Sequence, residues 1–282
     1  MPFRPIVLGL IVAVVASCSS EPAMVHQMRK VRLITAVREA LLESVEAEKS
    51  AVLATTDEES ASMAHEAGQS AATINQLRRE LRALVVADGR RVEIEKLDAF
   101  DAAWAEFERV DQRLLALAMA NTNLKAARLA ASQGAADLDR FVDTLTEMAR
   151  SATASATIRT LSGAVTAALR IQPLALVHIP AADDAEMTRL EERMRALGDE
   201  VDRGLAVLRE DGQVSPDQLA AATQAWGDYQ RVLKDVLRLS RENTNVVSSD
   251  VSVHEKRQVT KECLTALAAL LEAVDIGPKA VR

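Results

Sequence analysis

Six side chains in two matching sets are the candidate ligand-binding residues of this chain. The sets are separated by a constant offset of 122 residues and consist of Trp104, Arg109 and Asn121, and of Trp226, Arg231 and Asn243. A guanidinium can bind a carboxylate through two parallel hydrogen bonds, and an indole can form one wall of a pocket. An amide close to the apolar stripe of a helix needs a polar partner, which a ligand could supply. The pattern therefore predicts a polar cavity for a small molecule in each of two repeated units.

Each of these residue types also has a structural interpretation, which the sequence leaves open. Large aromatic residues at helical spacing are usually core residues. A single buried Asn can fix the register and the partner of packed helices, as it does in coiled coils. Arg109 and Arg231 lie away from the main apolar stripe of their helices, which indicates exposure to solvent.

The sequence contains no arrangement of residues that is typical of catalysis. None of the four histidines, His26, His65, His178 and His254, follows a Glu-x-x-His pattern, and we expect them to be exposed or to cap helices. Haem attachment, phosphate-loop and nucleophile-elbow motifs are also missing. We therefore expect a non-enzymatic protein with no catalytic residues, no metal site and no cofactor.

Composition indicates long packed helices. Aromatic residues make up 2% of the chain, whereas apolar residues make up 49% and charged residues 27%, which is a mixture typical of helical bundles. The net charge is −7, and nucleic acid is excluded as a partner because binding its backbone depends on clustered Lys and Arg. Cys263 has apolar neighbours at three- and four-residue spacings, which predicts a small buried core residue.

Seven amphipathic helices are predicted from the apolar periodicity and the capping signals. Thr56 with Glu59, Asp183 with Glu186, and Ser215 before Pro216 are the expected helix starts. The predicted helices cover residues 26–55, 56–88, 92–131 and 135–178, then one from Asp183, one from Ser215, and the last over 252–275. A bend is expected at Pro173.

The two matching sets belong to a longer internal repeat. Phe107 also corresponds to Tyr229, which makes the helices around Trp104 and Trp226 two copies of one element. The fold class that follows is all-α, with two antiparallel four-helix bundles in tandem that share one long central helix. The predicted bundles cover residues 26–154 and 155–276, and the segment SATASAT at 151–157 lies at the boundary between them.

The N-terminus predicts export and lipid attachment. A small and apolar segment runs from Ile6 to Ala16, and about 12 helical residues span about 18 Å, too little for the roughly 30 Å hydrocarbon core of a membrane. Residues 1–17 therefore indicate a signal peptide, with 277–282 as a C-terminal tail. The sequence Val15–Cys18 resembles the lipobox of bacterial lipoproteins, which implies lipidation of Cys18 and a lipidated tether over 18–25. An ordinary secretory signal that is cut nearby is the alternative.

The order of these features resembles the four-helix-bundle sensory domain of methyl-accepting chemotaxis proteins, and the duplication resembles their helical bimodular sensors. The matching features are Glu48 and Lys49 before an apolar turn, the short acidic hairpin Asp57–Glu59, and the Trp104 helix that ends in Asn121. No second apolar span and no methylated coiled coil precede Arg282, so we expect no transmembrane signalling by this chain alone. The resemblance implies a sensor-type module.

These observations predict a non-enzymatic, lipid-anchored, extracytoplasmic sensor-like module that binds a small ligand such as an organic acid. The alternative is an envelope scaffold whose helical faces bind other proteins. The expected partners are the membrane, through the N-terminal lipid, and a small molecule or an envelope protein. The expected location is the periplasmic side of the cell envelope, where Ser19, in place of Asp, favours the outer membrane.

Overall fold

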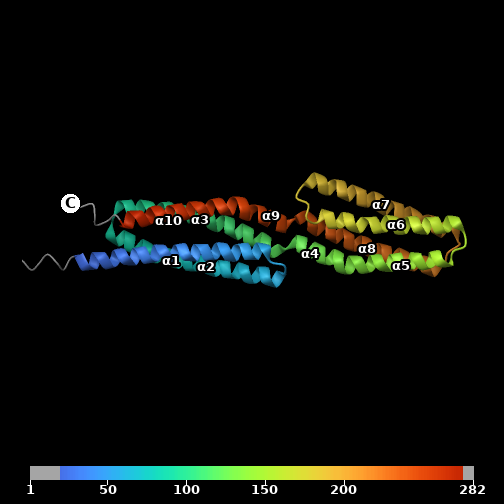
Figure 1. The fold of residues 1–282 in the computed structure, drawn as a ribbon, viewed down its shortest axis with the longest axis horizontal. Coiled ribbons are helices and arrows are strands. Elements are labelled where there is room, and N and C mark those ends of the chain that lie inside the picture. The colour runs from blue at the N-terminus through green and yellow to red at the C-terminus, as the bar shows by residue number, and fades with distance from the viewer. Residues whose placement is uncertain (1–19, 276–282) are drawn as a thin grey trace, which may run out of the picture. The chain divides into compact units, whose positions relative to one another are not determined.

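A computed structural model describes residues 20–275, and the described chain is helical from end to end except at short connections (Figure 1). Its helices are α1 (Ser20–Leu53), α2 (Asp57–Asp88), α3 (Arg91–Ala120), α4 (Thr122–Leu129), α5 (Ala135–Ser151), α6 (Ser155–His178), α7 (Asp184–Asp211), α8 (Pro216–Glu242), α9 (Thr244–Val251) and α10 (Arg257–Asp275), with π-helical turns η1 (Ala130–Gly134) and η2 (Ser252–Lys256). The predicted all-α class is confirmed. The predicted signal peptide, Cys18 and the tail 277–282 lie outside the described residues.

Two of the three predicted helix caps form. The backbone N–H of Glu59 donates to Thr56 Oγ1 at 3.0 Å, while Glu59 Oε2 accepts from the N–H of Thr55 at 3.1 Å. Asp183 Oδ1 accepts from the N–H of Ala185 at 2.7 Å. Ser215 makes no cap hydrogen bond through its side chain, although Pro216 begins α8 as expected. Side chains therefore satisfy the free N–H groups at the starts of α2 and α7.

The predicted helix 92–131 is interrupted at Asn121, and the second copy is interrupted at Asn243. Both residues have a left-handed backbone conformation, with φ of 49° and 51°. Asn tolerates this region better than other residues with a Cβ, so the backbone turns once and then continues as α4 or α9. Each of these short helices leads into a π-helical turn, η1 or η2. The two copies thus share a local backbone pattern as well as a sequence.

The predicted long central helix is wrong, because the chain is not helical over residues 152–154. Ala152 and Ala154 are extended, with ψ of 137° and 123°. Ser151 Oγ bonds the carbonyls of Glu147 and Met148 and thereby closes the last turn of α5. No large side chain in this stretch could stabilise a helix by burial. The chain therefore reverses between α5 and α6, and α6 continues through Pro173 to His178.

The described chain forms two compact units that interleave in the sequence. Unit 1 contains residues 20–48, 64–111 and 255–275, and unit 2 contains residues 49–63 and 112–254. This division corrects the predicted boundary between residues 154 and 155, since α5 and α6 both lie in unit 2, while α10 belongs to unit 1. Within unit 1, Gln27 Nε2 donates to the carbonyl of Val274 at 2.7 Å, and Arg90 donates to that of Ala273 at 3.3 Å. The boundary could not be placed from the sequence, because an apolar stripe shows that one face of a helix is buried but does not show which helices bury it.

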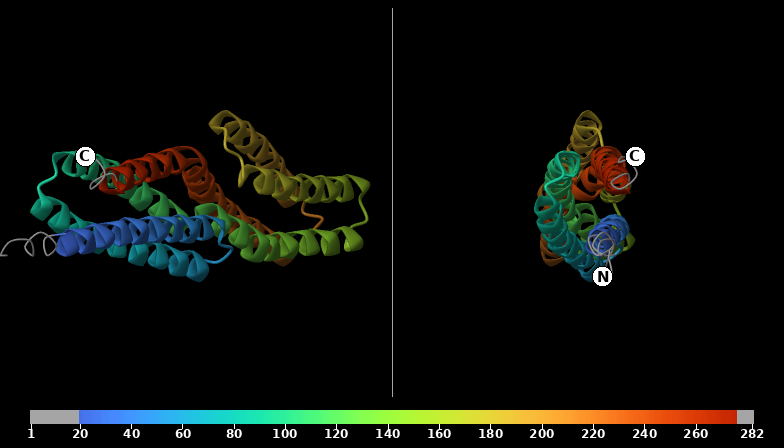
Figure 2. Two further views of the ribbon diagram at one scale, coloured as in Figure 1. Left: turned by 60° about the vertical axis from the view of Figure 1, so that its left-hand side comes forward. Right: turned by 90° about the vertical axis from the view of Figure 1, so that its left-hand side faces the viewer.

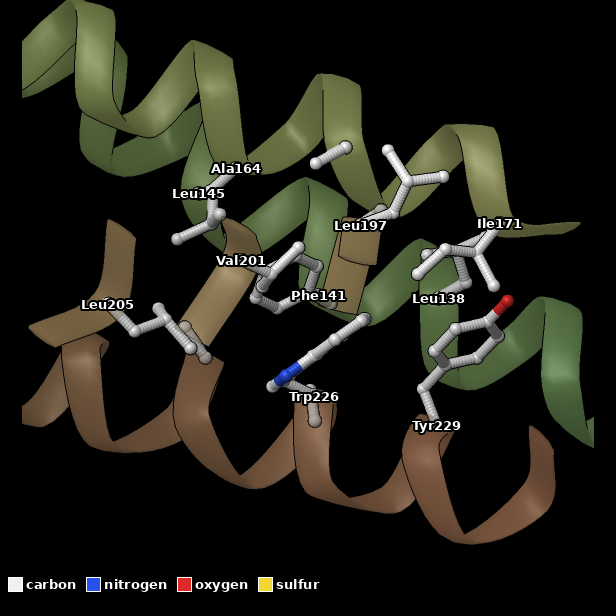
Figure 3. Packing of buried hydrophobic residues seen from close by; sticks show 14 of the residues in the cluster. Leu138, Phe141, Leu145, Ala164, Ile171, Leu197, Val201, Leu205, Trp226 and Tyr229 are labelled. Atoms are coloured by element: carbon white, nitrogen blue, oxygen red, sulfur yellow. The ribbon is translucent and has the colours of Figure 1, made fainter. Parts of the chain in front are cut away.

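Unit 2 is a four-helix bundle built by α5, α6, α7 and α8, which short loops connect in order. Phe141 of α5 and Trp226 of α8 meet at its centre, with ring centroids 5.3 Å apart. Leucine, valine and isoleucine side chains from all four helices surround them (Figure 3). This core fixes the positions of the polar residues that border it.

Unit 1 buries ionic pairs as well as an apolar core. Lys30 Nζ lies 2.6 Å from Glu93 Oε2, and these residues are 1% and 0% exposed. Lys256 pairs with Asp111 and lies over the Phe107 ring, 3.4 Å from its centroid. Burial lowers the pKa of Lys256, although Asp111 opposes this shift. Cys263 is fully buried as predicted, and burial raises its pKa to about 12.

Candidate functional site

The repeated Asn-Thr-Asn segments bind each other inside unit 2. The N–H of Thr122 donates to Thr244 Oγ1 at 3.0 Å, and the N–H of Thr244 donates to Thr122 Oγ1 at 3.1 Å. The N–H groups of Asn123 and Asn245 donate in the same reciprocal way to each other's Oδ1, both at 3.1 Å. Equivalent residues of the two copies are thus paired, in a local arrangement with twofold pseudosymmetry.

The predicted site residues Asn121 and Asn243 take part in the same network. Asn121 Oδ1 accepts from Asn245 Nδ2 at 2.8 Å, and Asn243 Oδ1 accepts from Asn123 Nδ2 at 2.7 Å. Asn243 Nδ2 also donates to the carbonyl of Ala181 at 3.0 Å. These bonds favour the structural interpretation, in which buried amides fix which helices pair and in what register.

The two tryptophans lie in different units and have similar polar partners. Trp104 is fully buried in unit 1, where its Nε1 donates to Asn75 Oδ1 at 3.0 Å. Trp226 is 2% exposed in unit 2, and its Nε1 donates to Asp202 Oδ1 at 2.6 Å. Both rings are core residues. Trp226 also lines a cleft in unit 2.

Arg109 and Arg231 lie apart from the predicted site residues of their own copies. Their side chains are 56% and 78% exposed, and each pairs with an acidic residue one turn earlier, Glu106 or Asp228. The interpretation as solvent-exposed residues fits this placement. The structure therefore brings neither arginine into a pocket with Trp or Asn.

The cleft that contains Trp226 lies between α7 and α8. Helix α7 packs along α6 and meets α8 over a shorter stretch (Figures 1 and 2). This leaves a cleft of about 470 Å³, with Met194, Trp226 and Leu237 among its apolar lining residues. Its size falls in the ordinary range for small-molecule sites.

A buried histidine borders this cleft, in contrast to the exposed or capping histidines predicted from the sequence. His178 at the end of α6 is 0% exposed. Its Nε2 lies 3.0 Å from Glu191 Oε1, and its Nδ1 lies 2.8 Å from Ser240 Oγ. Glu191 Oε1 also accepts from Arg241 Nε at 2.7 Å. The signal that was missed is the apolar stripe of α6, in which His178 follows Ile171 and Ala175 at helical spacing.

Burial and ion pairing shift the pKa values of this group. Burial lowers the pKa of His178, while the hydrogen bond to Glu191 acts in the opposite direction. The hydrogen bond from Arg241 lowers the pKa of Glu191, and the same bond raises that of Arg241. Glu191 is therefore ionised at neutral pH, and it is shared between a guanidinium and an imidazole.

Three further charged residues line the cleft with no hydrogen bond or ion pair to any part of the chain that the structure describes. They are Arg195 and Asp199 of α7 and Lys234 of α8. By contrast, Arg238 pairs with Asp235 and Glu242 on its own helix. The cleft thus offers two free cationic groups and one free carboxylate, and Trp226 is also part of its lining.

Comparison with known proteins yields one family. A family model described as a four helix bundle sensory module for signal transduction matches residues 24–167. No curated protein and no solved structure matches the chain.

Proposed function

Because this chain belongs to the family of four-helix-bundle sensory modules for signal transduction, we propose that it is a non-enzymatic, lipid-anchored sensor that binds a small organic anion. The α7–α8 cleft of unit 2 is the proposed binding site. The sensory family supports the general role, and the charges of the cleft support the class of ligand.

The observation that carries this proposal is the pair of free cations, Arg195 and Lys234, on opposite sides of one cleft. A carboxylate between them would gain charge-assisted hydrogen bonds, which are stronger than neutral ones. Asp199 can accept a hydrogen bond from a hydroxyl or ammonium group of the same ligand. The site therefore favours hydroxy acids and amino acids over unsubstituted carboxylates.

Thermal unfolding of the full chain tests this assignment. The panel contains hydroxy acids, amino acids and simple dicarboxylates, with polyamines and divalent metal ions as comparisons. A ligand at about 100 times its dissociation constant adds about 2.7 kcal/mol of stability when it binds only the folded state. Stabilisation by an acid should be lost in Arg195→Gln and Lys234→Gln.

Arg231→Gln is the matched control, because it removes an exposed arginine of α8 that lies outside the cleft. It should leave ligand binding unchanged. Loss of binding in Arg231→Gln, or stabilisation by polyamines alone, would show that the proposed site or ligand class is wrong.

Lipid attachment is a separate part of the proposal and rests on the sequence Val15–Cys18. Two or three acyl chains would hold the protein stably on the periplasmic side of a membrane, with the outer membrane favoured by Ser19. Cys18→Ala should abolish the incorporation of radiolabelled palmitate, and Cys263→Ala should leave it intact. Continued labelling of Cys18→Ala would contradict the anchor.

An envelope scaffold is the second candidate function, and one face of α6 favours it. Ile158, Leu169 and Leu176 are 36–49% exposed at helical spacing. Among the described helices, α6 is also the one that is long and apolar enough to cross a membrane, although core helices pass the same test. Other α6 residues, among them Leu161 and Ile171, are buried in the unit 2 core. Crosslinks from Leu169 to another envelope protein, together with no stabilisation by any acid, would favour the scaffold.

A further inference from the structure

The buried His178 shares its carboxylate partner with an arginine of the cleft. Glu191 Oε1 lies 3.0 Å from His178 Nε2 and 2.7 Å from Arg241 Nε. His178 is fully buried, whereas Arg241 and Glu191 retain 32% and 23% of their side-chain exposure and line the cleft. The carboxylate of Glu191 therefore connects a group that can take up a proton to a cation that a ligand can reach.

Ser240 allows His178 to change its charge without moving. Its Oγ lies 2.8 Å from His178 Nδ1 and 3.0 Å from the carbonyl oxygen of the same histidine. When the imidazole is neutral, with its proton on Nε2 toward Glu191, the hydroxyl can donate to Nδ1. When the imidazole is charged, Nδ1–H donates to Oγ, and the hydroxyl donates to the carbonyl instead. One rotation of a hydroxyl hydrogen accommodates the extra proton.

We infer that the α7–α8 cleft is proton-linked: protonation of His178 and the binding of an anion in the cleft, close enough to Arg241 to offset its charge, favour each other. This inference builds on the proposed function, because it concerns regulation of the same site. The geometry gives the sign of the linkage, which is positive.

The sign follows from the charges around His178 on each packed element. Helix α6 supplies His178 itself, α7 supplies Glu191 and Asp184, and α8 supplies Arg241 beside Ser240. The positive charge of Arg241 opposes protonation of His178, and an anion bound to Arg241 offsets that charge. Conversely, when His178 is protonated, the negative charge of Glu191 is shared between two cations. The positive charge of Arg241 is then less fully neutralised. Each event therefore lowers the free-energy cost of the other.

Histidine NMR of the full chain measures the first half of this linkage without a ligand. The chain has four histidines, so the signal of His178 can be identified by its loss in His178→Gln. Arg241→Gln should raise the pKa of His178 by about one unit, because a nearby cation is removed. Glu191→Gln should lower it, since the carboxylate that favours the imidazolium is lost. Opposite shifts from two neighbouring substitutions are not expected from a general loosening of the fold.

Arg238→Gln is the control, because Arg238 lines the same cleft but pairs only within α8. It should leave the titration of His178 in place. If Arg241→Gln does not fold, Thr188→Val provides the second variant, because Thr188 accepts a hydrogen bond from Arg241. An unchanged His178 titration in the folded Arg241 or Thr188 variant and in Glu191→Gln would overturn the inference.

Sulfate is the probe for the second half, because its charge is constant across the titration range of histidine. If sulfate raises the pKa of His178 by about one unit, it must bind about tenfold more tightly once His178 is charged. Sulfate binding at the cleft with no pH dependence would overturn the linkage. Failure of every acid in the thermal panel would contradict the proposed ligand class, while the shifts in Arg241→Gln and Glu191→Gln would still report on His178.

Discussion

Lys256 and Asp111 show what a buried charge pair implies for the stability of unit 1. Their side chains are 1% and 7% exposed, and removal of one partner from a buried pair leaves the other charge uncompensated. Asp111→Asn should lower the free energy of unfolding by about 3 kcal/mol, as measured by urea denaturation. Glu106→Gln is the matched control on the same helix, because it breaks the exposed pair with Arg109 and should cost less than about 1 kcal/mol. Equal effects of the two substitutions would contradict the prediction.

Asp88 makes part of the stability of unit 1 dependent on pH, so that this part is lost in acid. The hydrogen bond from Lys30 holds the pKa of Asp88 below its ordinary value of 3.8. A carboxyl whose pKa is lowered by folding contributes stability above its unfolded value, and this contribution is lost as the pH falls through the folded value. In Asp88→Asn, the free energy of unfolding should fall less steeply with acid below about pH 4. Urea unfolding at several acidic pH values measures the two slopes, and parallel slopes would rule the contribution out.

At the scale of elements, substitutions at the two asparagines with left-handed backbone can distinguish the contribution of backbone geometry to stability from that of side-chain hydrogen bonds. Gly tolerates φ near 50° without strain, so Asn121→Gly and Asn243→Gly remove only the side-chain bonds. The side-chain amide of Asn243 donates a hydrogen bond to the carbonyl of Ala181. This bond has no counterpart among the hydrogen bonds described for Asn121. Asn243→Gly should therefore destabilise the protein by about 1 kcal/mol more than Asn121→Gly.

Asn243→Ala should cost a further 1–2 kcal/mol or so, because Ala disfavours the left-handed region. Thermal unfolding ranks the three variants. If Asn243→Ala were as stable as Asn243→Gly, the left-handed backbone at this position would be contradicted.

Much of the helical pattern could be predicted from the sequence, because the apolar periodicity and caps such as Thr56 with Glu59 are local signals. The interruption at Asn121 could not, since Asn-Thr-Asn lies within an unbroken helical pattern and depends on its pairing with the second copy. The break over residues 152–154 is equally hidden, because small residues are compatible with both a helix and a turn.

The polar group at the cleft was missed for a different reason. His178 is 62 residues from Ser240 and 13 from Glu191 in the sequence, and no motif connects them. Trp226 was found because it repeats Trp104. Sequence repetition therefore identified residues that the two copies share, whereas the free charges of the cleft occur only in the second copy and carry no repeat signal.

For the whole molecule, the interleaved units predict which fragments can fold. The core residues of unit 2, from Leu138 to Tyr229, all lie within residues 112–254. A fragment of residues 112–254 should therefore unfold cooperatively in urea. The fragment 155–276, which corresponds to the second predicted bundle, lacks α5 with its buried Leu138, Phe141 and Leu145. It should show no cooperative transition, and circular dichroism during urea titration compares the two.

The position of α10 in unit 1 also sets the order in which the chain can fold during synthesis. Unit 2 has all of its residues once His254 has been made, whereas unit 1 requires residues 255–275. Helices α1, α2 and α3 are thus the first to be made, yet their core stays uncovered until the last helix has emerged. Exposed apolar surface on a partly made chain favours aggregation. The earliest part of this protein therefore depends longest on protection by the cell's folding machinery.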